Sequence, residues 1–221
     1  KSIYDIPINF EKEGLSKLLA KLLHITFPAK KPTTALAWKK MVSVVHNTKD
    51  EVRIAIVGKY FDTGAFTLSD SYLSVIEAVK YSAYAQGKKP VIDWVNAIEF
   101  EKDPKSVKKL SNYHGVLVPG GFGNRGIEGK ILAIKYAREH KIPYLGLCYG
   151  MQLAVIEYAR HVSGIKGATS RELDPKSSVC VIDVMDSQKE KLKKEEYGGS
   201  MRLGSYEALL KKGTIARTLY K

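Results

Sequence analysis

The chain has 221 residues, of which 44% are hydrophobic and 27% charged, and this suits one domain with a sizeable core, or one domain and a tail. No apolar run reaches the roughly 18 residues of a membrane-spanning helix, the N-terminal stretch lacks the apolar core of a signal peptide, and two cysteines make neither a disulfide framework nor a zinc site. This cysteine usage favours a reducing cytoplasm.

The net charge of +13 comes from scattered lysines. We therefore expect a solvated lysine-rich surface, with attraction of small anions as the alternative, and neither a nucleic-acid nor a membrane partner.

Residues 1–50 are predicted to form a helical segment distinct from the rest of the chain. Leucines recur at helical spacing over residues 15–23, which is typical of an amphipathic helix. Pro28 and Pro32 interrupt the pattern, and residues 35–46 resume it. We expect a helical connector whose apolar faces pack against a neighbour.

From Val52 onward, strand and helix patterns alternate. The predicted strands are 52–58, 90–96, 114–121 and 142–148, and the predicted helices are 68–87, 103–111, 126–140 and 150–162. Such alternation predicts an α/β fold, an open and mostly parallel sheet with helices on both faces. Ser69 is the expected N-cap of the first of these helices, and Gly87 its stop. Ligands of such sheets bind beyond the carboxyl ends of the strands, where the glycine-rich stretches 120–126 and 146–150 fall.

The last part of the chain is less regular. Residues 177–185 read as another strand, and residues 186–199 as a charged loop without alternation. Residues 200–221 resemble short strands and turns. No internal repeat is present in the sequence.

Cys148 stands at the predicted junction of a strand and a helix, in the sequence Gly-Leu-Cys-Tyr-Gly. This G-x-C-x-G pattern is typical of a nucleophile elbow, a sharp turn that exposes its central side chain and needs small residues beside it. Gly146 and Gly150 supply them. The N-terminus of the following helix favours the thiolate, and the amide of Tyr149 can donate to an oxyanion. The alternative, a buried and inert cysteine, is disfavoured by the two glycines.

Two further predictions concern the core around this elbow. Cys180, inside an apolar strand pattern, is expected to be a core residue rather than a reactive one. The helix after the elbow carries an apolar stripe that we also expect in the core. The stripe consists of Met151, Ala154, Val155, Tyr158, Ala159 and Val162.

The stretch VPGGFGNRG offers a second glycine-rich motif. Gly121, Gly123 and Gly126 match the G-x-G-x-x-G pattern of dinucleotide sites, but the next strand lacks the acidic residue that such a site requires. The segment VGKY is not a phosphate-binding loop either, because Arg53 and Tyr60 stand where glycine and serine or threonine belong. The better interpretation is a backbone loop that presents amides toward the elbow, as the second half of an oxyanion hole.

These motifs together resemble a known family. GLCYGMQ, with PGGFGNRGIEGK upstream, resembles the class I (triad) glutamine amidotransferases, and within them the amidotransferase domains of the CTP synthase family. VGKY, DSYLSVIEA and GGSMRLG match that subfamily in order. SIYDIP through AWKKMV is similar to the end of its synthetase domain and linker, so the resemblance covers essentially the whole chain. Tyr149 stands in place of the usual leucine, Ser200 in place of a threonine, and the loop after Lys59 is slightly longer. The Tyr149 ring is thus expected to narrow the substrate pocket.

The resemblance implies roles for individual residues. Cys148 would attack the side-chain amide of glutamine and form a glutamyl thioester, while the amides of Gly121 and Tyr149 hold the oxyanion. Glu172 matches the acidic residue that binds the glutamine α-amino group, although taken alone it reads as a solvated loop carboxylate. The implied glutamine-binding residues are Gly121, Tyr149, Gly150, Met151, Gln152 and Glu172. No metal site is implied in this domain.

The resemblance also implies partners. Residues 1–50 would be the end of a synthetase domain and the linker, and residues 51–221 the amidotransferase domain. Ammonia would pass to the synthetase domain, where Mg and ATP serve the amination of UTP to CTP. GTP would act as activator, and the protein would be a homo-oligomer, dimer or tetramer.

The triad itself is incomplete in this sequence. The family has a histidine and a glutamate late in the domain, in a His-Pro-Glu stretch, and none of the five histidines here matches it. His161 follows Cys148 on the same predicted helix, about 20 Å away at roughly 1.5 Å per residue. We therefore expect a fragment cut at both ends. Two alternatives stay open: a triad-lacking domain that regulates or docks a partner, and an α/β-hydrolase, which would need an acid and a histidine after the cysteine.

Overall fold

The structure is a computed structural model that describes residues 2–26, 33–58, 72–121, 123–186, 188–189 and 207–220. Its centre is a sheet of four parallel strands in the order β2-β1-β3-β4. The strands are β1 (Glu51–Gly58), β2 (Lys89–Asn96), β3 (Gly115–Val118) and β4 (Tyr144–Gly146). All four predicted strands and their parallel arrangement are confirmed. Their carboxyl ends lie at one edge of the sheet, as parallel pairing requires.

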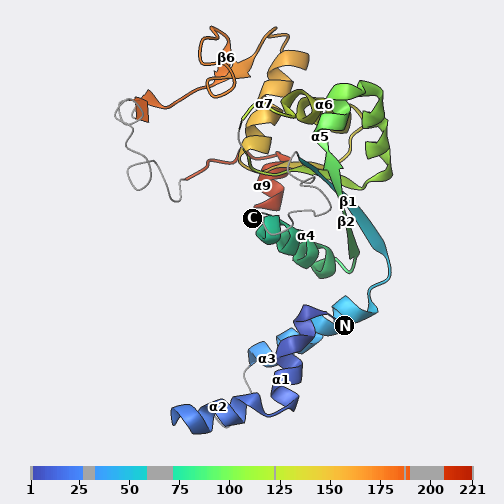
Figure 1. The fold of residues 1–221 in the computed structure, drawn as a ribbon, viewed down its shortest axis with the longest axis vertical. Coiled ribbons are helices and arrows are strands. Elements are labelled where there is room, and N and C mark those ends of the chain that lie inside the picture. Colours follow the sequence, from blue (N-terminus) through green and yellow to red (C-terminus); the bar gives the residue numbers. More distant parts are fainter. Residues whose placement is uncertain are drawn as a thin grey trace.

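Helices cover both faces of this sheet (Figure 1). They are α4 (Leu73–Ala85), α5 (Ala97–Lys102), α6 (Ile127–Glu139) and α7 (Tyr149–His161). On one face, buried Ile56 and Leu117 pack against α4. On the other face, Val57 and Val118 belong to the larger core, which α5, α6 and α7 complete. Neighbouring residues of a strand point to opposite faces, so the continuous apolar runs of β1 and β3 serve both layers.

Two elements differ from the sequence prediction. The sequence pattern predicts a helix over residues 103–111, and the structure forms a 3₁₀ helix there, η3 (Pro104–Asn112), whose first turn the Asp103 side chain caps. It is preceded by α5, which the sequence pattern does not predict and which the Asn96 side chain caps. Six residues are too few for the periodic pattern that identifies a helix. The expected N-cap Ser69 lies outside the described residues. Gly87 was expected to end this helix, and it lies just after α4 with a positive φ of 65°.

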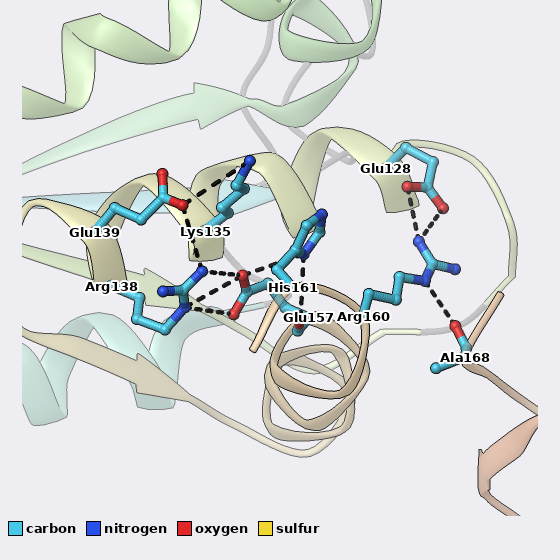
Figure 2. A network of polar contacts seen from close by, with 8 residues as sticks. All are labelled: Glu128, Lys135, Arg138, Glu139, Glu157, Arg160, His161 and Ala168. Carbon is cyan, nitrogen blue, oxygen red and sulfur yellow. Dashed lines mark hydrogen bonds and ion pairs between the residues drawn. The ribbon is translucent and has the colours of Figure 1, made fainter. Parts of the chain in front are cut away.

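A buried carboxylate joins α6 to α7 (Figure 2). Glu157 of α7 is 1% exposed and accepts hydrogen bonds from Arg138 of α6, with Nη2 at 2.8 Å. Nδ1 of His161 lies 3.3 Å from the same carboxylate. A second pair joins Arg160 of α7 to Glu128 at 2.9 Å. A buried charge is tolerated when it is paired and hydrogen-bonded, so these contacts fix how the two helices sit against each other.

The apolar stripe of the helix after the elbow was predicted to lie in the core, and for most of its residues this prediction is wrong. Its large members Met151, Val155, Tyr158 and Val162 are 40–54% exposed, and of the stripe only the two alanines pack against the core. The buried face of α7 instead carries Leu153 and Ile156. A helix with apolar residues on two sides presents two candidate faces, and the contact with β3 and α6 decides between them.

The N-terminal segment forms η1 (Ile3–Asp5), α1 (Ile6–Lys12), α2 (Leu15–Leu23) and α3 (Thr33–Asn47), beyond α4 in Figure 1. Buried Tyr4 donates its hydroxyl to Glu77 of α4. The Trp38 indole donates to the Tyr4 carbonyl at 2.9 Å. The predicted helices are thus present. Most leucines of α2 are exposed, and Pro28 and Pro32 lie outside the described residues.

The last part of the chain departs most from prediction. The strand expected at 177–185 is the short β6 (Cys180–Ile182), which pairs in parallel with β5 (Thr169–Ser170) in a separate sheet. Cys180 is half-buried rather than a core residue. Residues 207–220 contain the helix α9 (Ile215–Leu219), in place of the expected short strands and turns. Most of the predicted charged loop, 187 and 190–199, lies outside the described residues.

Candidate active site

Cys148 occupies the tight turn between β4 and α7 and has a backbone φ of 51° and ψ of −107°. A positive φ in a residue other than glycine stores strain, of order 1–3 kcal/mol, and is typical of functional sites. The flanking glycines permit the turn. A Cβ at Gly146 would lie 2.6 Å from the Gly150 carbonyl carbon, and one at Gly150 only 2.1 Å from the Val118 oxygen. The thiol is exposed at the carboxyl edge of the sheet.

Hydrogen bonds hold the elbow to β3 and to α7. The Leu147 amide donates to the Val118 carbonyl at 3.0 Å, and the Met151 and Gln152 amides donate to the Cys148 carbonyl at 3.1 and 3.2 Å. Cys148 is therefore the N-cap of α7, and the first turn of the helix begins directly behind the thiol. This is the geometry in which backbone amides and the helix dipole act on a developing negative charge.

The predicted glycine loop lies against the thiol. A Cβ built on Gly120 would be 3.4 Å from Cys148 Cβ and 3.9 Å from its Sγ. The Tyr72 hydroxyl donates to the Gly120 carbonyl at 3.3 Å. Further along the loop, the Tyr149 hydroxyl donates to the Gly123 carbonyl at 3.2 Å. Two phenolic side chains thus hold the two ends of a short glycine-rich segment.

The Tyr149 ring was expected to narrow the substrate pocket, but it lies in the core instead. The side chain is 1% exposed, and its ring belongs to the larger core. Burial, with a smaller contribution from the Glu172 charge, raises the pKa of Tyr149 to about 12. The phenol therefore remains a hydrogen-bond donor at neutral pH. In place of a leucine, the tyrosine adds a bond between α7 and the glycine loop.

The other predicted glutamine-binding residues lie around this loop. Glu172 follows β5, and its Oε1 accepts a hydrogen bond from the Gly123 amide at 3.3 Å. Gln152 is half-buried in the first turn of α7, Met151 is 51% exposed, and Gly121 is half-buried. The structure thus brings the loop, the elbow and Glu172 together. The binding roles of these residues stay predictions.

The histidines have their partners elsewhere. Nε2 of His46 lies 2.9 Å from Asp5, and Nδ1 of His114 accepts from the Arg53 amide at 3.0 Å. His140 stacks on Tyr136, and His161 belongs to the Glu157 cluster (Figure 2). The fifth, His24, ends α2 in the N-terminal segment. None of these positions supplies a base for Cys148.

Sequence reasoning missed two residues beside the loop. Tyr72 immediately precedes α4 but falls inside the helix predicted over residues 68–87, and no sequence signal singled out its hydroxyl. Lys130 of α6 is 2% exposed, with Nζ 5.6 Å from the centre of the Tyr149 ring. A lysine in a helix normally reads as a surface residue, so no sequence signal pointed to its burial.

Two classes of site were not found in the part of the chain that the structure describes. There, no group of three or more His, Cys, Asp or Glu side chains could hold a metal ion. The helices of the same part are too short or too polar to cross a membrane.

Comparison with known proteins adds the family. Residues 67–219 match the sequence model of the family described as glutamine amidotransferase class-I. The chain is 48% identical over 218 residues to a CTP synthase of Methanococcoides burtonii, covering 99% of this chain and 39% of that protein. It is 46% identical over 217 residues to a CTP synthase of Thermococcus kodakarensis, covering 98% of this chain and 38% of the relative.

A solved structure is also similar. The glutaminase domain of Trypanosoma brucei CTPS with bound acivicin matches with a TM-score of 0.58 and 39% identity, over 64% of this chain and 53% of that chain. The curated relatives are longer, and the chain spans about 39% of their length. The resemblance drawn from the motifs is thereby confirmed. The chain belongs to the class I glutamine amidotransferase family.

Proposed function

We propose that this chain is the glutamine-hydrolysing part of a CTP synthase. The observation that carries the proposal is the cysteine elbow: an exposed thiol at a positive φ, at the start of a helix and against a glycine loop. The relatives named CTP synthase support the choice within the family. The solved glutaminase domain of similar fold has acivicin bound, which supports a small-molecule site in this chain as well.

The chemistry follows from the elbow. The Cys148 sulfur attacks the side-chain amide carbon of glutamine, the C–N bond breaks, and ammonia leaves with one added proton while a glutamyl thioester remains. Water then splits the thioester into glutamate and the free thiol. The Gly121 and Tyr149 amides are the proposed donors to the oxyanion of both tetrahedral intermediates. The proton carrier is the family's triad histidine, which none of this chain's histidines matches.

The substrate would be oriented by the residues around the loop. Glu172 would bind the α-ammonium group of glutamine, while Gly150, Met151 and Gln152 line the binding site. Glu172 already accepts from the Gly123 amide, so its carboxylate lies beside the loop that carries the proposed oxyanion donor. A single residue would then link recognition of the substrate to the position of the loop.

The ammonia would serve a synthetase domain of the whole protein. There ATP, with Mg, would activate UTP for amination to CTP, and GTP would activate the glutaminase reaction. We further propose a cytoplasmic homo-oligomer without nucleic-acid or membrane partners. These proposals rest on the CTP synthases that the chain matches along part of their length.

The test compares two nitrogen sources in the full-length protein. Cys148→Ala should lower glutamine-dependent CTP formation by more than about a thousandfold and leave ammonia-dependent formation unchanged. Cys180→Ser is the matched control, because Cys180 is the second cysteine of the chain and is half-buried in β6. It should leave both activities unchanged. Glutamine use that survives Cys148→Ala would overturn the proposal. Normal ammonia use without any glutamine use in the unmodified protein would favour the regulatory alternative.

A further inference from the structure

Tyr72 links the α4 side of the sheet to the glycine loop. It stands directly before α4, and its ring packs in the smaller core, with its centre 6.0 Å from that of Trp94. Its hydroxyl donates to the Gly120 carbonyl at 3.3 Å. The ring packs against residues of the sheet, and this packing positions the hydroxyl beside the loop.

That hydrogen bond constrains one particular peptide unit. The carbonyl of Gly120 and the amide of Gly121 belong to the same planar group, and in a trans peptide they point in opposite directions. Fixing the carbonyl therefore fixes the direction of the Gly121 N–H. Both residues are glycines, which have the widest backbone freedom of all residues, so this peptide depends on external contacts for its orientation.

The same peptide adjoins the nucleophile. The position of a Cβ on Gly120 is 3.9 Å from Cys148 Sγ, so a rotation of the Gly120–Gly121 peptide changes the surroundings of the thiol directly. A second carbonyl contact in the loop, from Tyr149 to Gly123, is three residues further on. It holds a different peptide unit. Tyr72 and Tyr149 therefore act on separate ends of the loop.

We propose that Tyr72 is a positioning residue that orients the Gly121 amide toward the oxyanion of the glutaminase reaction. The inference rests on the proposed function, in which Gly121 is an oxyanion donor. Tyr72 does not touch the reacting atoms. Its hydroxyl holds the carbonyl side of the peptide, and the amide side acts on the substrate. An oxyanion donor lowers the barrier only when it is held in place before charge develops.

The experiment uses the full-length protein with Tyr72→Phe, which removes the hydroxyl and keeps the ring. Glutamine-dependent kcat should fall about ten- to a hundredfold, less than the loss of a whole oxyanion donor. The KM for glutamine should stay within about twofold, since the donor acts mainly on the transition state. Ammonia-dependent activity should not change.

A second readout separates positioning from general damage. Iodoacetamide alkylates a thiol by direct displacement at carbon and forms no oxyanion, so its rate at Cys148 should be the same in Tyr72→Phe and in the unmodified protein. The matched control is Tyr4→Phe, which removes a tyrosine hydroxyl bonded to Glu77 on the same helix α4. That variant should keep the full glutamine-dependent kcat.

Three outcomes would overturn the inference: an unchanged kcat in Tyr72→Phe, an equal loss in Tyr4→Phe, or a loss of iodoacetamide reactivity that matches the loss of turnover. Cys148→Ala in the same assay keeps the two proposals apart. If it abolishes glutamine use while Tyr72→Phe does not change it, only the role of Tyr72 is wrong. If Cys148→Ala retains glutamine use, the proposed function is wrong.

Discussion

At the scale of single residues, the candidate site depends on two positions without side chains. Gly146 and Gly150 enclose the turn of Cys148, and a Cβ at Gly150 would lie 2.1 Å from the Val118 oxygen and 3.0 Å from Val118 Cβ. The Val118 oxygen also accepts from the Leu147 amide. The turn and the end of β3 are thus packed backbone to backbone, which leaves no room to relax.

We predict that Gly150→Ala destabilises the protein and removes glutaminase activity together. Overpacking of this kind costs about 1–3 kcal/mol, because either β3 or the first turn of α7 must shift. Urea unfolding of the full-length variant measures the loss. Ser163→Ala, at an exposed position just past α7, is the control and should stay within about 0.5 kcal/mol of the unmodified protein. A fully stable and active Gly150→Ala protein would contradict the elbow geometry.

Glu172 offers a separable prediction. Glu172→Gln keeps an oxygen that can accept from the Gly123 amide and removes only the negative charge. Losing one charge-assisted contact to the substrate ammonium should cost about 1.5–3 kcal/mol, roughly ten- to a hundredfold in glutamine use. Steady-state kinetics with glutamine and with ammonia measure this, and ammonia use should be retained.

The control for Glu172→Gln is Glu51→Gln. Glu51 is the first residue of β1 and so lies at the amino end of this strand, whereas the elbow lies at the carboxyl edge of the sheet. Glu51 pairs with Lys89 at the surface, and its neutralisation should leave both activities unchanged. Unaltered KM and kcat for glutamine in Glu172→Gln would remove the residue from the proposed binding site.

At the scale of elements, the ion pairs between α6 and α7 (Figure 2) hold the helix that carries the elbow. The Glu157 side chain is 1% exposed. Its hydrogen bonds to Arg138 are the chief reason that the pKa of Arg138 is raised. Removing the arginine would leave that carboxylate with His161 as its remaining partner in the cluster. Truncating one partner of a buried pair destabilises more than replacing both.

We therefore predict that Arg138→Met lowers the free energy of unfolding by about 1.5–3 kcal/mol, and that Arg138→Met with Glu157→Leu recovers much of the loss. Urea denaturation measures both variants. Glu139→Gln removes an exposed carboxylate 3.5 Å from the same guanidinium and should change stability by less than about 0.5 kcal/mol. A double variant as unstable as the single one would show that the pair contributes more than it costs to bury.

At the scale of the whole molecule, the described residues leave apolar side chains exposed on the α4 side of the sheet. A groove of about 480 Å³ runs between α4 and β4 and is lined by apolar side chains, among them Val79, Leu117 and Leu147. Leu145 in this groove is 52% exposed. On the other face of the sheet, Met151, Val155 and Tyr158 of α7 and Val162 just after it are also 40–54% exposed. Exposed apolar surface of this kind favours association.

We predict that the 221-residue chain, produced by itself, associates and binds the dye ANS. Leu145→Lys should reduce both, because it places a charge in the groove. Light scattering and ANS fluorescence provide the measurement. Leu209→Lys is the control: this side chain is 98% exposed and is not among the residues that line the groove, so its replacement should change neither. A monomer without ANS binding would contradict the prediction.

The sequence alone was sufficient for the sheet and for the elbow. Strands of continuous apolar residues and helices of ten or more residues carry strong periodic signals, so β1 to β4, α4, α6 and α7 were all predicted. The elbow was predicted because a turn at Cys148 requires glycine at 146 and 150 for steric reasons, and a steric requirement is visible in the residue types themselves.

Only the tertiary structure decided which groups face one another. It turned the Met151 stripe of α7 outward, because contacts with β3 and α6 select one face of a helix that has two apolar sides. It buried the Tyr149 ring and placed the Tyr72 hydroxyl on the Gly120 carbonyl, a contact between residues 48 positions apart. Local sequence determines backbone conformation and turn chemistry, whereas the pairing of distant side chains arises when the elements pack.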